Sequence, residues 1–241
     1  MEKFNLEKYI SRSGFASRTD ARELILNHRV AVNNQTISDL TYRVSEADFI
    51  SINGIPINLI EKVRLFMFHK PRGCIVTADD PHDRKTIFHL LPKNLPRLIS
   101  VGRLDFNSEG LLLMTNYGPL ARYFELPENN IKRVYELKLF GTWNENNIEY
   151  LKKGIKVDGM QYQPIDARIL SRKNNQIKLE CALHEGKNRE LRKIFTNLGL
   201  LVPKLTRTSY GGFFLGSLPQ GQIIECKKFI VDKILKNAQL I

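Results

Sequence analysis

The sequence predicts an α+β protein with two unequal domains, and three observations support this prediction. Apolar residues recur at helical spacing between Leu6 and Ile25. Residues 133–139 and 176–183 alternate between apolar and polar side chains, as half-buried strands do. Residues 1–60 hold seven basic and seven acidic residues, so the rest of the chain carries the whole net charge of +12. We expect a small domain at residues 1–58, a linker at 59–64 and a larger domain at 65–241.

Composition limits the partners and the compartment. The 241 residues are 42% hydrophobic and 26% charged, which is typical of a globular protein with a substantial core. The net charge of +12 favours a polyanion, either nucleic acid or an anionic membrane surface. Nucleic acid is preferred, because no apolar run approaches the roughly 20 residues of a membrane span and the N-terminus has no signal-peptide pattern. Cys74, Cys181 and Cys226 lack paired spacing, which fits neither a disulfide framework nor a zinc site and indicates a cytoplasmic protein.

The first domain is expected to contain two helices, a hairpin and a closing strand. Ser17 and Asp20 have the spacing of a capping box at the start of the second helix. Residues 30–32 alternate into an Asn-Asn turn at 33–34, which predicts a hairpin. Residues 48–54 then predict a last strand that ends in an Asn-Gly turn.

Three short sequence motifs in this domain resemble those of the S4 RNA-binding domain. They are Ser-Gly-Phe-Ala-Ser-Arg at 13–18, Ala-Arg-Glu-Leu-Ile at 21–25 and Arg-Val-Ala-Val-Asn at 29–33. The resemblance covers nearly all of residues 5–56, and it implies that Arg18, Arg22 and Arg29 contact RNA. Without the resemblance, three such arginines would be interpreted as a solvated face.

The most informative segment of the larger domain surrounds Asp105. This residue lies in a polar loop directly before the apolar run 111–114, which Gly110 and Asn116 bound as turn signals. A loop that enters a buried strand is a rigid place from which to present a reactive group. Gly-Arg-Leu-Asp at 102–105 followed by Gly-Leu-Leu-Leu resembles the catalytic motif of the pseudouridine synthases that modify ribosomal RNA at single sites. Taken alone, Asp105 would be an ordinary loop residue with a structural hydrogen bond.

A second segment places Tyr135 on the apolar face of the strand predicted at 133–139. Taken alone, this position indicates a core aromatic residue with a satisfied hydroxyl group. In the family, a Tyr that follows a basic residue by two positions enters the active site, and Arg133 and Tyr135 match that pattern.

The third segment is a strand at 176–183 followed by an amphipathic helix. Asn188 is the predicted N-cap and Gly199 the predicted C-cap of this helix. Arg189, Arg192 and Lys193 share its polar side, where a basic solvated face is the alternative to RNA contact.

Residues 185–192, Glu-Gly-Lys-Asn-Arg-Glu-Leu-Arg, resemble the family's third motif. Its final Arg, which pairs with the catalytic Asp, corresponds to Arg192. Lys187, Arg189 and Lys193 become candidate RNA contacts. Glu190 stands where many relatives have Gln.

Two further basic residues are candidate RNA contacts. Lys70 belongs to His-Lys-Pro-Arg-Gly at 69–73, which resembles the family's first motif. Arg103 precedes Asp105 by two residues, so it is the candidate to fill the space that a flipped base leaves, and a phosphate contact is its alternative role. The loop at 80–84 is equally open to solvation or RNA contact.

The resemblance implies a catalytic domain with a bent, mainly antiparallel sheet and a reaction that converts uridine to pseudouridine in ribosomal RNA. Asp105 would be the essential carboxylate and would act on the ribose, on the base or on a sugar proton. Tyr135 would stack on the base or transfer a proton. Arg192 would orient Asp105. Residues 205–211 and 218–221 are most similar to the branch acting on 23S rRNA.

The expected protein is a monomer that uses neither cofactor nor metal. No Gly-rich phosphate loop, metal-ligand spacing or serine-hydrolase motif suggests another chemistry. The alternatives are a non-catalytic RNA-binding protein of ribosome assembly, and a synthase acting on 16S rRNA or tRNA.

Overall fold

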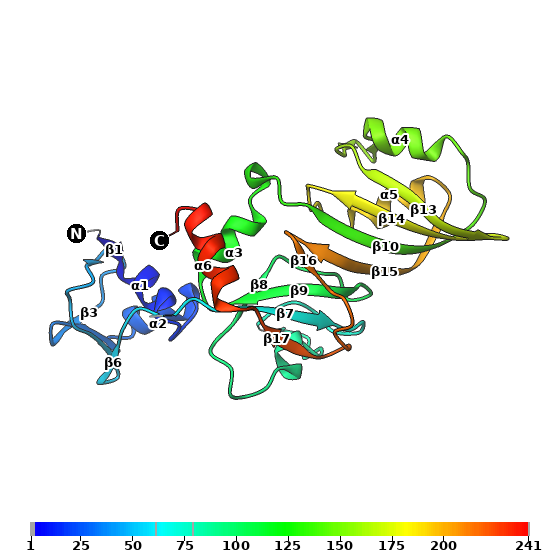
Figure 1. Cartoon of the computed structure of the whole chain (residues 1–241). Coiled ribbons are helices and arrows are strands. Elements are labelled where there is room, and N and C mark those ends of the chain that lie inside the picture. Colours follow the sequence, from blue (N-terminus) through cyan, green and yellow to red (C-terminus); the bar gives the residue numbers. More distant parts are fainter. Residues whose placement is uncertain (1–2, 61, 79, 241) are drawn as a thin grey trace. The chain divides into compact units, whose positions relative to one another are not determined.

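The computed structural model describes residues 3–60, 62–78 and 80–240, and these form two compact units (Figure 1). The first unit comprises Met1–Arg64 with the short segments Asn94–Ile99 and Thr115–Gly118, and the second comprises the remainder. Glu61, within the predicted linker, lies outside the described residues, and the domain limits stay predictions. Across the described ranges, no helix combines the length and apolar character needed to cross a bilayer.

The first unit contains the two predicted helices, α1 (Leu6–Arg12) and α2 (Arg18–Leu26). The capping box of α2 is confirmed, since Ser17 and Asp20 exchange side-chain to backbone hydrogen bonds of 3.1 and 3.2 Å. Its strands are β1 (Phe4–Asn5), β2 (Val30–Val32), β3 (Gln35–Ile37), β4 (Arg43–Val44), β5 (Ile50–Ile52) and β6 (Ile55–Ile57). They pair as an antiparallel sheet in the order β3-β2-β5-β6 and as the ribbon β1-β4.

The turns of this unit also follow the sequence pattern. Asn33 and Asn34 have φ values of 51° and 66° between β2 and β3, which confirms the predicted hairpin. Asparagine adopts this left-handed backbone more readily than most residues. The expected closing strand is β5, which ends in the Asn53–Gly54 turn.

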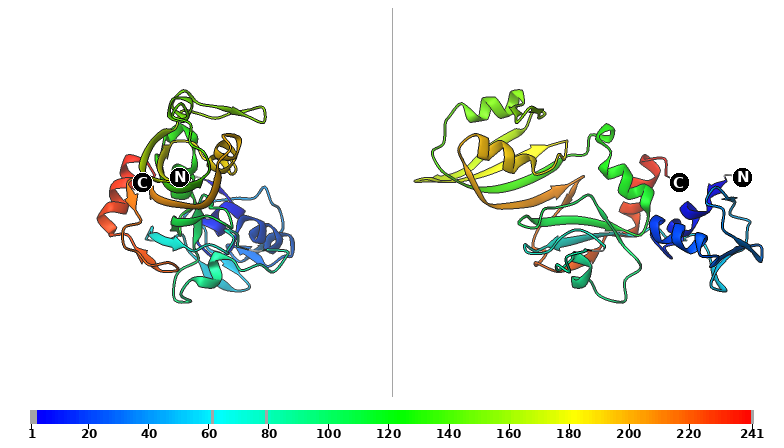
Figure 2. Two further views of the ribbon diagram at one scale, coloured as in Figure 1. Left: turned by 90° about the vertical axis from the view of Figure 1, so that its right-hand side faces the viewer. Right: turned by 180° about the vertical axis from the view of Figure 1, so that it is seen from behind.

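The second unit is built on a nine-stranded sheet. Seven strands follow the path β13-β14-β10-β15-β9-β7-β17, while β16 pairs with β15 and β8 pairs with β9. The strands are β7 (Leu65–Lys70), β8 (Ile99–Val101), β9 (Glu109–Thr115), β10 (Arg133–Phe140), β13 (Asp166–Lys173), β14 (Gln176–Leu183), β15 (Leu201–Tyr210), β16 (Phe213–Phe214) and β17 (Ile223–Glu225). β9 runs parallel to β15, whereas antiparallel pairs join β10 to β14 and β15, β13 to β14, and β17 to β7. Figure 2 shows β9, β7 and β17 on one side of β15 and β10, β14 and β13 on the other. The sheet is therefore mainly antiparallel, as expected.

Helices flank this sheet. They are α3 (Gly118–Glu125), α4 (Asn147–Lys153), α5 (Glu190–Asn197) and α6 (Lys228–Asn237), with short 3-10 turns at Ile87–Leu90 and Pro127–Asn129 and a small ribbon of β11 (Lys156–Val157) and β12 (Met160–Gln161). α4 packs near β13, and α5 packs near β15.

The predicted start of α5 is wrong by one residue. Arg189, and not Asn188, occupies the cap position, with a left-handed φ of 52°. The carboxyl group of Glu190 accepts a 3.1 Å hydrogen bond from the Lys187 backbone N–H, which holds the segment before the helix, whereas Arg189 makes no side-chain capping bond. This backbone turn determines where the Arg189 side chain points.

Gly110 lets β9 approach β15 closely. It lies opposite Arg207 in the parallel pair, with a φ of 110°. A Cβ atom at this position would collide with the Arg207 carbonyl oxygen and lie 2.6 Å from its backbone nitrogen. Only glycine fits here, and the contact fixes the loop before β9 against β15.

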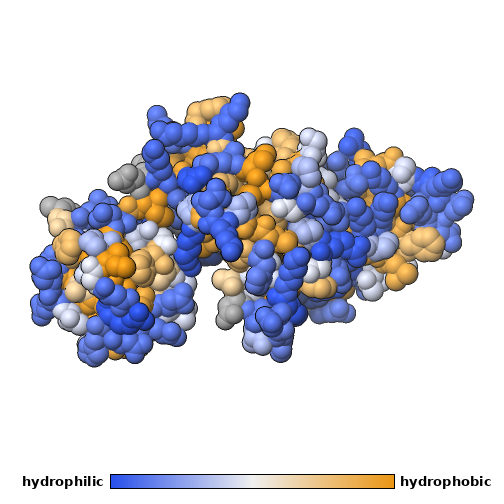
Figure 3. Space-filling view, turned by 90° about the horizontal axis from the view of Figure 1, so that it is seen from below, coloured by the Kyte–Doolittle hydropathy of each residue, from blue (hydrophilic) through white to orange (hydrophobic). Residues whose placement is uncertain are grey.

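Hydrophilic residues cover most of the face shown in Figure 3, with apolar residues scattered among them. The exposed apolar side chains include Phe106, Leu201 and Phe214. Scattered exposure of this kind is usual for a globular protein.

Candidate active site

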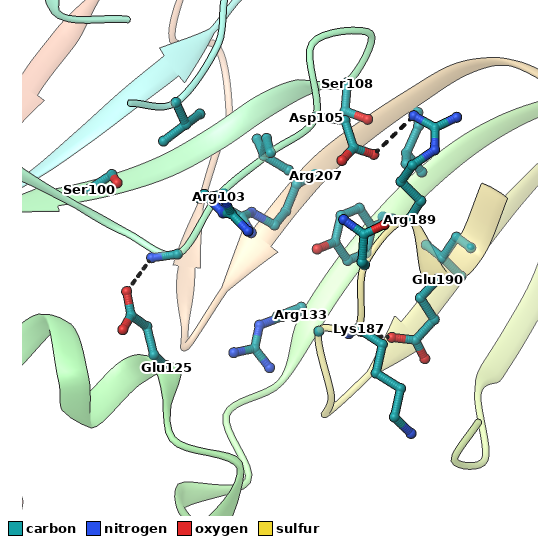
Figure 4. A pocket seen from close by; sticks show the side chains of 18 of the residues that line it. Ser100, Arg103, Asp105, Ser108, Glu125, Arg133, Lys187, Arg189, Glu190 and Arg207 are labelled. Carbon is teal, nitrogen blue, oxygen red and sulfur yellow. Dashed lines mark hydrogen bonds and ion pairs between the residues drawn. The ribbon is translucent and has the colours of Figure 1, made fainter. Parts of the chain in front are cut away.

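A cavity of about 1170 Å³ lies in the second unit. It is lined by residues of the Asp105 loop, β10, β15 and the segment before α5 (Figure 4). Five predicted site residues meet there: Asp105, Tyr135, Arg103, Lys187 and Arg189. The cavity brings together parts of three segments that are far apart in the sequence.

The buried side chain of Lys70 holds the Asp105 loop through hydrogen bonds. The Lys70 side chain is fully buried, and its Nζ donates to the carbonyl oxygens of Pro71, Asp105 and Ser108 at 3.0, 3.1 and 2.8 Å. An ammonium group has three donors, so all are used. Burial lowers the pKa of Lys70. Lys70 was predicted to contact RNA, but in this structure its side chain supports the loop from inside and its three donors bind protein carbonyl groups.

Two further donors complete this support. The Gly73 backbone N–H donates to the Phe106 carbonyl at 2.9 Å, and Arg192 Nη2 donates to the Asn107 carbonyl at 2.9 Å. The carbonyl groups of residues 105–108 are thus all hydrogen-bonded to neighbouring elements. The side chain of Asp105 is left 28% exposed at the cavity.

Arg192 and Arg189 divide the role that was predicted for Arg192. Arg192 donates to the Val202 carbonyl at 2.7 Å and reaches Ser108 Oγ at 3.4 Å, but it forms no ion pair with Asp105. The ion pair to Asp105 comes from Arg189 Nη1, at 3.9 Å from Oδ2 (Figure 4). The direct pair predicted for Arg192 is therefore absent, and Arg192 holds the backbone beneath Asp105.

Tyr135 lies on the buried face of β10, as the alternating pattern predicts. Across the strand pair it faces Arg207 of β15, and both side chains line the cavity. Arg207 is 2% exposed and was not among the predicted site residues. A charged residue at an inward position of the 205–211 strand was the available sequence signal.

A second buried arginine fixes the wall beside Tyr135. Arg133 donates to the carbonyl groups of Ile131, Phe124 and His184 and to the Tyr210 hydroxyl. The bond to His184, at 2.8 Å, attaches the start of the loop that carries Arg189. Both terminal nitrogens of Arg133 are thus engaged with protein acceptors.

Two neighbouring carboxyl groups, those of Glu185 and Glu190, belong to the segment that carries Arg189. Glu190 is 4% exposed, and burial together with the neighbouring Glu185 raises the pKa of Glu190 to about 8. Glu185 carries the charge of the pair, since its pKa is lowered and it contacts Lys187 Nζ at 2.6 Å. Glu190 is therefore a neutral acid near pH 7.

The other predicted RNA contacts are on the surface. Arg18, Arg22 and Arg29 are exposed on the first unit; Arg22 lies 3.6 Å from Glu7, and Arg29 donates to Asn53 at 2.8 Å. In the second unit, Arg103 is exposed at the cavity. Lys193 is also exposed but does not line the cavity.

Comparison with known proteins places the chain in a family. A family model described as RNA pseudouridylate synthase matches residues 64–197, and a model of the S4 domain matches residues 5–50. The chain therefore belongs to the RNA pseudouridylate synthase family. It is an RNA-modifying isomerase with an N-terminal S4 domain.

Individual relatives agree with this assignment over nearly the whole chain. An uncharacterised RNA pseudouridine synthase of Rickettsia typhi is 43% identical over 97% of this chain and 96% of its own length. The ribosomal large subunit pseudouridine synthase B of Bacillus subtilis is 35% identical over 95% of this chain and 94% of its own length. A crystal structure described as a pseudouridylate synthase has a TM-score of 0.68 and 26% identity, covering 95% of this chain and 98% of that one.

Proposed function

We propose that this enzyme converts one uridine, or a few, of 23S ribosomal RNA to pseudouridine. The observation that carries the proposal is the carboxylate of Asp105, presented on a loop whose carbonyl groups at 105–108 are all hydrogen-bonded, into a cavity that Tyr135 also lines. The choice of 23S rRNA is supported by the name of the Bacillus subtilis relative, a ribosomal large subunit synthase.

In this proposal the target uridine leaves its stack to enter the cavity, at a cost of a few kcal/mol. Asp105 then acts on the ribose, on the base or on a sugar proton, while Tyr135 stacks on the base or transfers a proton. Arg189 contributes a cation beside the carboxylate, and Arg192 positions its loop. Arg103, exposed at the cavity, fills or braces the space left by the flipped base.

Binding of the RNA is proposed to involve both units. Arg18, Arg22 and Arg29 supply contacts from the S4 domain, and Lys187, Arg189 and Lys193 supply contacts from the second unit. The enzyme acts as a monomer in the cytoplasm, where free cysteines such as the buried Cys74, Cys181 and Cys226 persist.

The test is to map pseudouridine in total RNA from cells with and without this protein. We expect one or a few 23S positions to lose the modification and to regain it when the wild-type gene, but not an Asp105→Asn gene, is restored. Loss at a 16S or tRNA position would replace the proposed substrate. An unchanged pseudouridine map with altered ribosomal particles would instead indicate an assembly role without catalysis.

A further inference from the structure

Arg207 has a buried hydrogen-bond donor that no described residue uses. Its side chain is 2% exposed and lines the cavity, where it is labelled in Figure 4. Nε donates to the Leu111 carbonyl at 2.7 Å, whereas Nη2 is buried and has no acceptor among the described residues. A buried donor without an acceptor costs about 1–3 kcal/mol, and more when the group is charged. Such a donor in a cavity wall indicates an acceptor that arrives with the ligand.

The fold places Arg207 beside Tyr135, the residue on which the base is proposed to stack. The register of β10 and β15 shifts between Val134, opposite Ser209, and Tyr135, opposite Arg207. Thr208 is left without a direct partner, which is the arrangement of a β-bulge, and bulges beside active sites commonly redirect a side chain. Directly opposed residues have their side chains on the same face of the sheet. The ring of Tyr135 and the guanidinium of Arg207 are therefore neighbours in one wall.

The charges around Arg207 leave it without a carboxylate partner of its own. Asp105 is paired with Arg189, and Glu109, two residues before Leu111, is paired with Lys204 at 2.7 Å. The ring of Tyr210 lies 4.7 Å from the Arg207 guanidinium carbon, so its π-face meets part of the charge. Both terminal nitrogens of Arg133 donate to carbonyl groups or to a hydroxyl group, whereas Nη2 of Arg207 is a terminal nitrogen with no acceptor among the described residues.

Building on the proposed function, we propose that Arg207 Nη2 donates to a carbonyl oxygen of the target uracil and stabilises the base while it is detached from the ribose. In the isomerisation the N1–C1′ bond breaks and its electron pair stays on the uracil, whose negative charge spreads to O2 and O4. The ribose is balanced by a bond to the Asp105 carboxylate or by loss of a ribose proton to it. C5 then bonds to C1′ as the Asp105–C1′ bond breaks or as Asp105 returns the ribose proton. C5 loses its proton and N1 gains one, so the product is an isomer of the substrate and Asp105 is regenerated as a carboxylate. Arg207 is a catalytic residue in this assignment, because its donor is already directed before the charge develops.

The first test compares Arg207→Met, Arg207→Lys and the control Arg168→Met. Arg168 is an exposed arginine on β13, paired with Glu180 at 2.9 Å. The measurements are the single-turnover rate at saturating RNA and the RNA Kd, using a fragment that contains the mapped uridine. We expect Arg207→Met to lose roughly 10²–10³-fold in rate, as for removal of one preorganised donor, with little change in Kd. Arg207→Lys should recover part of the rate, and Arg168→Met should match wild type.

The second test changes the acceptor on the RNA and needs only wild-type protein and the conservative variant Arg207→Lys, so it stands even if Arg207→Met does not fold. The target uridine is replaced by 2-thiouridine or 4-thiouridine, because sulfur is a weaker acceptor than oxygen. At the oxygen that Arg207 contacts, the substitution should slow the wild-type enzyme more than Arg207→Lys. Equal slowing of both enzymes by both analogues would overturn the assignment.

Two other results are also decisive. If Arg207→Met lost RNA affinity but kept the wild-type rate at saturation, Arg207 would be a phosphate ligand and the assignment would be wrong. If wild-type protein formed no pseudouridine in any RNA, the proposed function itself would fail. The two failures are distinguishable because the second appears before any variant is made.

Discussion

At the scale of single residues, the site depends on one carboxylate and on the groups that hold its backbone. Asp105→Asn keeps the size of the side chain but removes its charge, its nucleophilic oxygen and its ability to accept a proton. We expect isomerisation to be abolished, while the melting temperature and the RNA Kd stay close to wild type. The matched control is Asp232→Asn, on the exposed face of α6, which should retain full turnover. Wild-type turnover by purified Asp105→Asn protein would rule out this mechanism.

The different contacts of Arg192 and Lys193 lead to a second prediction. Arg192→Ala removes three hydrogen bonds to the Asp105 loop and to Val202, so turnover at saturating RNA should fall far more than affinity. Lys193→Ala, on the same helix but away from the cavity, should only lower affinity and reduce the salt dependence by about one phosphate contact. Arg192→Lys should rescue in part, since an ammonium lacks the planar fork of donors. A normal single-turnover rate for Arg192→Ala would show that the loop does not need this support.

The raised pKa of Glu190 predicts that the stability of the folded protein depends on pH. Its pKa rises from 4.5 to about 8 on folding, so between these values the folded state binds more protons than the unfolded state. Stability from this group is therefore fully present below about pH 4.5 and is lost as the pH rises through about 8. Glu190→Gln removes the titration, so its unfolding free energy should exceed that of wild type by a few kcal/mol near pH 9, and the two should converge only as the pH falls toward about 4.5. Glu180→Gln, an exposed control, should show no such divergence; parallel curves for Glu190→Gln and wild type would contradict the prediction.

At the scale of elements, the close approach of β9 to β15 depends on Gly110. Gly110→Ala places a methyl group against the Arg207 backbone and requires an L-residue at a φ of 110°. We expect a loss of more than about 2 kcal/mol in unfolding stability, together with reduced turnover, because β9 follows the Asp105 loop directly. Gly118→Ala is the control, since its nearest neighbour would be 4.0 Å away and its backbone is not left-handed. Denaturant unfolding of both variants distinguishes this contact from a general effect of alanine.

The sequence pattern predicted some elements well because the information is local. The Ser17–Asp20 capping box and the hairpin at Asn33–Asn34 each depend on residues that are adjacent along the chain. The alternation that placed Tyr135 inward is likewise a property of one strand. By contrast, Lys70 finds its acceptors 35 and 38 residues away, so its burial could not be read from its motif.

The roles of Arg207 and Arg189 were missed because they depend on contacts between segments that are far apart in the sequence. Arg207 was missed because its position opposite Tyr135 depends on a bulge between two strands, which no single segment encodes. The pair with Asp105 was assigned to Arg192 from the resemblance of residues 185–192 to the family's third motif. The left-handed turn that brings Arg189 to Asp105 precedes the helix, so the helical pattern did not describe it.

At the scale of the whole molecule, the charge division predicts how the units share RNA binding. Residues 1–60 are neutral overall and the remainder carries +12, so removal of residues 1–58 should retain a strong, salt-dependent affinity. Site choice should become less selective, because the exposed Arg18, Arg22 and Arg29 are lost. The measurements are RNA Kd against salt concentration and the pseudouridine map of the truncated enzyme. Circular dichroism supplies the control for folding, and an unfolded truncated chain would contradict the two-domain prediction.

Lys70 has a consequence for how the enzyme loses activity on heating. Its ammonium joins the end of β7 to two carbonyl groups of the Asp105 loop, with no solvent exposure. Freeing this loop would leave a buried cation without acceptors, so the loop should not open separately from the sheet beneath it. The backbone amide of Ser108, which donates to the Asp105 carbonyl within the loop, should then exchange with deuterium as slowly as those of β7 and β9. Inactivation and cooperative melting should coincide in temperature, without a folded but inactive state between them.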